Sequence, residues 1–224
     1  EVDFFIFSIA IVFPLVFSIT SAYQRRQEAI MIFSEFRNKI IDTSNILYAV
    51  NGIHKKDYDK IFSGLIDIQQ DFIDHLKNDK DIDNFQRIRQ KRKNIFKEII
   101  SYKDLYNERE KDSLIATKNE IFLCMEKLNG LKLHSTPVSL RRYCLIFIYL
   151  SPFLFNTKLI TEGQFEMSLG IDLPVSILFS ITISFILMAL YNIQDYIENP
   201  FDQKGLDDLQ IDQMQIFEKE SLYE

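Results

Sequence analysis

The chain has few of the residue types and motifs that enzyme active sites use. Its 224 residues include two cysteines, three histidines and six glycines. Cys124 and Cys144 have neither metal-site spacing nor the pattern of a disulfide framework, and no His–Glu or Cys–His cluster has metal-ligand spacing. No glycine-rich phosphate loop and no nucleophile elbow occurs. The sequence therefore predicts no enzyme and no resident cofactor or metal.

Strand signals are missing as well. Glycine is scarce, and no alternating apolar–polar run of any length occurs. Between residues 34 and 133 the apolar residues instead recur at spacings near 3.6 residues, which predicts an all-α chain. The expected elements are a helix that contains Ile61, Leu65, Ile68, Phe72, Ile73 and Leu76, a turn at 78–81, a helix over 85–106, and a last helix over 114–128 that stops at Asn129-Gly130.

The apolar residues are concentrated in three nearly uncharged segments. The mean hydropathy of −0.05 and the net charge of −6 would suit a soluble protein, but residues 4–21, 143–160 and 173–193 depart from that average. Each has about the ~17–25 residues that a helix needs to span the hydrocarbon core, where helix is the default structure. We therefore expect three membrane helices. The alternative is that they are core helices of a soluble bundle.

The positions of the basic residues indicate how the chain is oriented in a membrane. All but three of the 26 lysines and arginines lie between Tyr23 and Arg142, and residues 161–172 contain none. Because basic residues mark the cytoplasmic side, we expect an integral membrane protein of the cell membrane, or of the inner membrane if bacterial, with residues 23–142 cytoplasmic. This topology places Glu1 outside, so we expect a further membrane helix before it. No basic–aromatic platform indicates a nucleic-acid partner.

One face of the first apolar segment is a candidate pore wall. Ile9, Phe13 and Phe17 are four residues apart and share one side of a helix. A ring of identical subunits would stack these side chains into three apolar rings, which can gate a pore by excluding water. The alternative is that the stripe faces lipid or neighbouring helices.

Three segments, in this order along the chain, resemble the bestrophin family of ion channels. The first, SAYQRRQEA at residues 21–29, is similar to the family segment AYxRWWEA, with Arg26 and Gln27 where two tryptophans are usual. The second, residues 134–145 followed by Leu-Ser-Pro-Phe at 150–153, looks like the entry into the third family helix. The third is Glu-Asn-Pro-Phe at 198–201, directly after the last apolar segment. The residues that match family motifs are Arg25, Pro137, Asn199, Pro200 and Phe201.

The resemblance implies a homopentamer with a central pore, four membrane helices per subunit and a helical cytoplasmic vestibule continuous with them. It places Ile9, Phe13 and Phe17 at the hydrophobic neck of the pore. It also implies passive flow of chloride and other small anions, with membrane lipid around the subunits. Some bacterial members of the family pass cations, so a cation channel is the alternative.

The acidic C-terminal segment, residues 198–224, bears on calcium. The family's calcium clasp uses the loop after the Glu-Asn-Pro-Phe motif, where this chain has Asp202, Asp207 and Asp208. Ca²⁺ takes six to eight oxygen ligands, and Lys204 interrupts the acidic run. We therefore expect no calcium control, and helix capping or solvation is the alternative role of these carboxylates.

Two other functional classes differ from a channel. A membrane-anchored helical scaffold or signalling protein would account for the helices and the charge pattern, but not for the three ordered motifs. A membrane enzyme is disfavoured because the apolar segments lack paired catalytic His, Asp or Glu residues.

Overall fold

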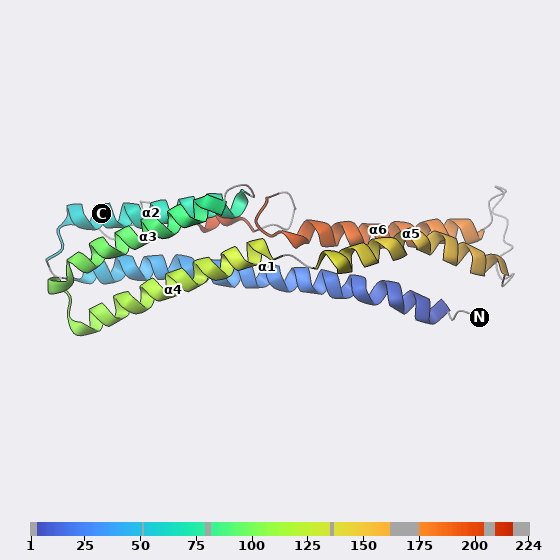
Figure 1. Ribbon diagram of the computed structural model, residues 1–224, viewed down its shortest axis with the longest axis horizontal. Coiled ribbons are helices and arrows are strands. Elements are labelled where there is room, and N and C mark those ends of the chain that lie inside the picture. The colour runs from blue at the N-terminus through green and yellow to red at the C-terminus, as the bar shows by residue number, and fades with distance from the viewer. Residues whose placement is uncertain are drawn as a thin grey trace. The chain divides into compact units, whose positions relative to one another are not determined.

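The computed structural model describes residues 4–50, 52–78, 82–134, 137–161, 175–203 and 209–216, and all regular structure in these ranges is helical, which confirms the predicted all-α fold. The elements are α1 (Phe4–Ala49), α2 (Lys55–Lys77), α3 (Ile82–Ser101), η1 (Lys103–Leu105), α4 (Glu108–Leu133), α5 (Val138–Thr161), α6 (Val175–Glu198) and η2 (Ile211–Met214) (Figure 1).

The chain divides into two compact units. The first consists of residues 1–26 and 135–199, and the second of residues 27–134 and 200–224. Helix α1 contributes to both, because the boundary falls inside it. The three segments predicted to cross a membrane lie in α1, α5 and α6, which all belong to the first unit. That the whole chain acts as one integrated subunit stays a prediction.

The first unit has a small core between α1, α5 and α6. Leu15, Cys144, Ile148 and Leu187 are its buried members. Helix α5 contains Pro152, whose missing N–H would leave the carbonyl of Ile148 without its helical partner. The Ser151 hydroxyl donates to that carbonyl at 2.8 Å. The proline is therefore accommodated inside the helix.

Helix α6 has the length and composition of a membrane span. In the described part of the chain it is the one helix that is long and apolar enough to cross a membrane, over Ile177–Glu198. Only 17% of its most apolar window is buried. A core helix of a soluble protein would be mostly covered by its own fold.

The second unit has a large core built from the rest of α1 with α2, α3 and α4. The predicted apolar stripe of α2 is confirmed, because all six of its residues are buried. Its centre is aromatic: the rings of Phe36 and Phe72 meet edge to face at 5.3 Å. Gly64 lets α2 approach α3 closely, since a Cβ atom there would lie 2.7 Å from Ile95 Cδ1.

The predicted end of the last helix in this region was wrong. Helix α4 continues through Asn129 and Gly130 to Leu133. Contacts distant in sequence hold the extra turn: the Asn129 Oδ1 atom lies 2.9 Å from His75 Nε2, and Lys132 donates to the carbonyl of Asn78 at 2.6 Å. These contacts outweigh the local stop signal.

The boundaries of the preceding helix were also misplaced. We expected a helix over 85–106, whereas α3 ends at Ser101 and η1 follows. The Tyr106 hydroxyl folds back to donate to the Ile99 carbonyl at 2.9 Å, which fixes a turn where the sequence suggested more helix.

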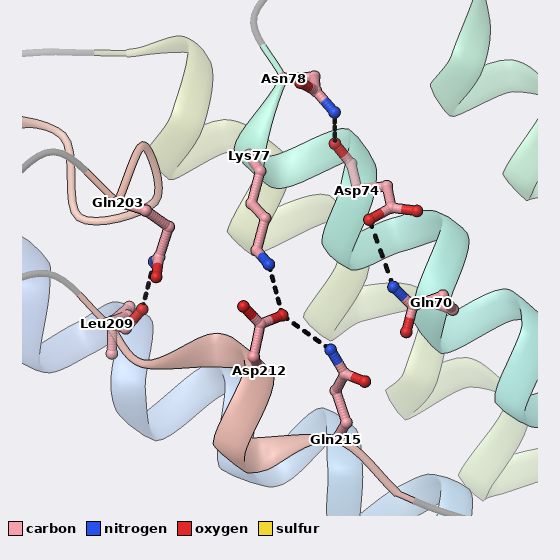
Figure 2. A network of polar contacts seen from close by, with 8 residues as sticks. All are labelled: Gln70, Asp74, Lys77, Asn78, Gln203, Leu209, Asp212 and Gln215. Atoms are coloured by element: carbon pink, nitrogen blue, oxygen red, sulfur yellow. Dashed lines mark hydrogen bonds and ion pairs between the residues drawn. The ribbon is translucent and has the colours of Figure 1, made fainter.

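The residues after α6 belong to the second unit. Phe201, Leu209, Ile211 and Ile216 are all buried in its core. The Leu209 amide donates to the Pro200 carbonyl at 3.1 Å, and Gln69 accepts a hydrogen bond from the Ile216 amide at 3.0 Å. Figure 2 shows Asp212 contacting both Lys77 of α2 and Gln215. We refer to the described residues 200–203 and 209–216 as the C-terminal strap.

Candidate pore-lining face and its anchoring ion pairs

The predicted stripe on α1 faces away from its own unit. The exposed fractions of Ile9, Phe13 and Phe17 are 47%, 62% and 62%. The rings of Phe13 and Phe17 are 5.4 Å apart and tilted at 47°. On the opposite side of the same helix, Leu15 and Ser18 are buried. The structure thus places the three predicted neck residues together on one uncovered helical face.

This face is apolar across its width as well as along its length. Val12 and Val16 lie beside the stripe and are 45% and 49% exposed. Thr20 is also exposed, but its hydroxyl donates to the Val16 carbonyl at 2.9 Å and is satisfied within the helix. We refer to Ile9, Val12, Phe13, Val16 and Phe17 as the α1 apolar face.

The other two helices of the unit also expose large apolar side chains. Phe153 of α5 is 72% exposed and Phe185 of α6 is 73% exposed. Contiguous apolar surface of this kind marks a segment that lipid or other protein surrounds. The unit therefore has an apolar exterior on all three of its helices.

An ion pair ties α1 to the end of α6. Arg25 Nη1 lies 3.3 Å from Glu198 Oε1, and the two side chains are only 15% and 7% exposed. Gln194 Nε2 donates to the other carboxylate oxygen of Glu198 at 3.0 Å. Both oxygens of this nearly buried carboxylate are therefore paired, as its burial requires.

A second pair ties α5 to α6. Arg141 Nη1 lies 3.3 Å from Asp195 Oδ1, with side chains 24% and 62% exposed. The Tyr143 hydroxyl also donates to the Ala10 carbonyl of α1, at 3.4 Å. The three helices are thus linked by polar contacts as well as by their small core.

Sequence reasoning missed both pairings. The sequence patterns assigned no partner to Asp195 or to Glu198. The available signal was that Arg25 and Arg141 flank apolar segments on the side predicted to hold the end of α6. The sequence does not specify which arginine meets which carboxylate.

The remaining motif residues lie where the chain changes direction. Pro137 precedes α5, and its carbonyl accepts from the amides of Leu140 and Arg141 at 3.0 and 3.4 Å. Helix α6 ends at Glu198, directly before Asn199 and Pro200. Phe201 is fully buried.

The acidic loop is described only in part. Asp202 is half-buried, whereas Asp207 and Asp208 lie outside the described residues. Within the described ranges no group of three or more His, Cys, Asp or Glu side chains could hold a metal ion. The absence of calcium control stays a prediction.

The sequence matches no protein-family model and no curated protein. Solved structures do match. A bacterial bestrophin homologue from Klebsiella pneumoniae superposes with a TM-score of 0.77 at 15% identity, over 93% of this chain and 81% of that chain. The chain has the bestrophin fold.

Two variants of the same homologue give similar superpositions. One has a TM-score of 0.78 at 15% identity, over 95% of this chain and 81% of that chain. The other has a TM-score of 0.73 at 16% identity, over 93% and 82%. The bestrophin-like fold predicted from the three motifs is therefore confirmed.

Proposed function

We propose that the chain is the pore-forming subunit of an oligomeric membrane channel that passes chloride and other small anions passively. The observation that carries this proposal is the α1 apolar face, which is exposed along its length while the opposite side of the helix is buried. The bestrophin fold supports it, because the superposed proteins are bestrophin homologues.

The arrangement of the first unit supports a place within a membrane. Helix α6 is long and apolar enough to span one, and α1 and α5 also present apolar side chains outward. The ion pairs at Glu198 and Asp195 lie at one end of α6, where a membrane helix meets the interface. We propose that this end, and the second unit, which contains most of the chain's lysines and arginines, are cytoplasmic.

One copy of α1 cannot enclose a channel, so the proposal requires an oligomer. A closed ring in which each copy contributes its α1 apolar face would produce stacked rings of Ile9, Phe13 and Phe17. We propose five copies, as the family resemblance implies. A narrow apolar constriction of this kind excludes water when closed and so can gate the flow of ions.

The aromatic rings favour anions over cations. The edge of a phenyl ring carries partial positive charge. Phe13 and Phe17 turned edge-on to the lumen would stabilise a partly dehydrated anion. This is the basis for the proposed selectivity, and a cation channel is its direct competitor.

Substitution on two faces of the first unit tests the pore assignment. We would measure single-channel conductance in planar bilayers for the wild type, Phe13→Ala and Phe185→Ala. Both residues are strongly exposed phenylalanines, but Phe185 lies on α6. We expect Phe13→Ala to change conductance or selectivity and Phe185→Ala to leave both unchanged.

Two results would contradict the assignment. Equal effects of the two substitutions would mean that α1 does not line the pore. No current from a well-formed oligomer, with and without calcium, would favour the membrane-anchored scaffold.

A further inference from the structure

The second unit contains a cavity that the proposed channel does not use. It has a volume of about 130 Å³ and lies between α3, η1 and the first half of α4. Its walls include Phe96, Ile99, Tyr106 and Leu114, each no more than 6% exposed. Ile100 and Ile115, which are about half exposed, also line it. A cavity of roughly 150 Å³ with apolar walls is large enough to bind benzene.

The cavity wall offers no free hydroxyl. The only hydroxyl among its lining residues is that of Tyr106, and this group donates to the Ile99 carbonyl at 2.9 Å. Burial raises the pKa of Tyr106 to about 12, so the phenol stays protonated at neutral pH. A sugar or a nucleotide would bring polar groups that this wall cannot satisfy. The interior therefore suits an apolar group.

The charged side chains that line the cavity are all basic. Lys103, Lys111 and Lys118 are also among its lining residues. Lys111 has a local partner in Glu108 at 3.0 Å. Lys103 and Lys118 form no ion pair within the described residues. Two ammonium groups thus remain to meet an anion beside an apolar interior.

Two nearby carboxylates do not neutralise these lysines. Glu110 accepts a hydrogen bond from the Asn107 amide at 2.8 Å in the capping box that starts α4. Glu98 is paired with Lys60 of α2 at 2.5 Å. Only the Glu98 charge is paired within the unit, and Glu110 keeps its charge in the capping box. An anion at the cavity would therefore be met by Lys103 and Lys118.

We propose that this cavity binds a small carboxylate whose apolar body is about the size of one aromatic ring. The ring would lie among Phe96, Ile99 and Leu114, and Lys103 and Lys118 would hold the carboxylate. Apolar walls with a few placed charges are the general pattern of small-molecule sites. The proposal is independent of whether the chain conducts ions.

The direct test is ligand-observed ¹⁹F NMR with 4-fluorobenzoate as the probe. The full chain would be held in lipid nanodiscs, and empty nanodiscs would serve as the blank for partition into lipid. The neutral isostere 4-fluorobenzamide would be titrated in parallel. We expect saturable binding of the carboxylate and at least tenfold weaker binding of the amide, because the amide carries no charge for the lysines to pair.

Three variants separate the charged from the apolar part of the site. Lys103→Gln combined with Lys118→Gln should weaken carboxylate binding about tenfold or more. Ile115→Trp, at an exposed position, should fill the cavity and abolish binding without disturbing the core. Lys97→Gln is the matched control, because Lys97 is an exposed lysine of α3 outside the cavity, and it should bind like the wild type.

Three outcomes would overturn the proposal. One is equal binding of the carboxylate and the amide. Another is an unchanged affinity in the double lysine variant. The third is no saturable binding to protein whose circular dichroism shows intact helices.

Discussion

Arg25 of α1 and Glu198 at the end of α6 form an ion pair of 3.3 Å across 173 residues of sequence. The pair is nearly buried, and the amide of Gln194 occupies the second carboxylate oxygen of Glu198. It joins the helix that carries the α1 apolar face to the helix with the strongest character of a membrane span. The orientation of the α1 apolar face therefore depends on a polar contact at Arg25, just after the C-terminal end of α1's apolar segment.

The Arg25–Glu198 ion pair should contribute far more to stability than the Arg141–Asp195 pair. Breaking a buried ion pair by removing one partner costs about 3–5 kcal/mol, whereas exposed pairs contribute about 0–1 kcal/mol. We expect Arg25→Gln to lower the free energy of unfolding strongly and Arg141→Gln to lower it little, because Asp195 is 62% exposed. Denaturation followed by circular dichroism at 222 nm measures both.

A double-mutant cycle isolates the interaction. Arg25→Gln, Glu198→Gln and the double variant should show a coupling energy well above that of the cycle through Arg141 and Asp195. Additive effects in the first cycle would mean that the two side chains stabilise the fold independently.

The C-terminal strap should be required for the stability of the second unit. Phe201 is fully buried there, and Phe→Ala in a protein core typically costs about 3–5 kcal/mol. We expect Phe201→Ala to lower the unfolding temperature markedly and to make the strap sensitive to limited proteolysis. Gln210→Ala, an exposed position of the same strap, is the control and should have no effect. Equal stability of the two variants would show that the strap is not part of the core.

The start of α4 should depend on a single side chain. Asn107 accepts from the Glu110 amide at 2.9 Å, and Glu110 accepts from the Asn107 amide, which completes a capping box. Replacing such a cap with alanine costs about 1 kcal/mol. We expect Asn107→Ala to lower the unfolding temperature and Asn107→Ser to restore most of the loss. Indistinguishable variants would show that packing alone fixes the helix start.

Cys124 should be chemically inert in the folded protein. Burial raises the pKa of its thiol to about 11, so almost no reactive thiolate exists at pH 8. We expect iodoacetamide at pH 8 to leave Cys124 unlabelled in the native protein and to label it after denaturation, as read by peptide mass spectrometry. A cysteine placed at exposed Lys97 is the positive control, and equal labelling at the two positions would contradict the buried thiol.

The raised pKa of Cys124 also predicts how the stability of the fold changes at alkaline pH. The folded pKa of Cys124 lies above the ordinary value of about 8.5. Its contribution to stability is therefore complete below that ordinary value and is lost as the pH rises through the folded pKa, because the unfolded chain releases the proton first.

Local patterns in the sequence predicted most of the fold. The periodic apolar residues of α2 and the three apolar segments of the first unit are helical features that depend on neighbours within a few turns. The stripe of Ile9, Phe13 and Phe17 was predictable for the same reason, because helical spacing alone places these residues on one face.

What the sequence could not predict depends on contacts between distant residues. Helix α4 passes through Gly130 because Asn129 and Lys132 contact α2 and its C-terminal end. The pairing of Arg25 with Glu198 requires α1 and α6 to be placed side by side first. The cavity beside Lys103 and Lys118 arises from the turn that Tyr106 fixes, which interrupted the predicted helix.

The reversal potential of the wild-type protein in a planar bilayer under a KCl gradient tests the central claim most directly. The chain would be reconstituted as the purified oligomer, and the current recorded with equal calcium on both sides. An anion channel predicts a reversal potential close to the chloride equilibrium potential. Reversal at the potassium equilibrium potential would contradict the proposed selectivity, and the absence of current from an intact oligomer would contradict the channel itself.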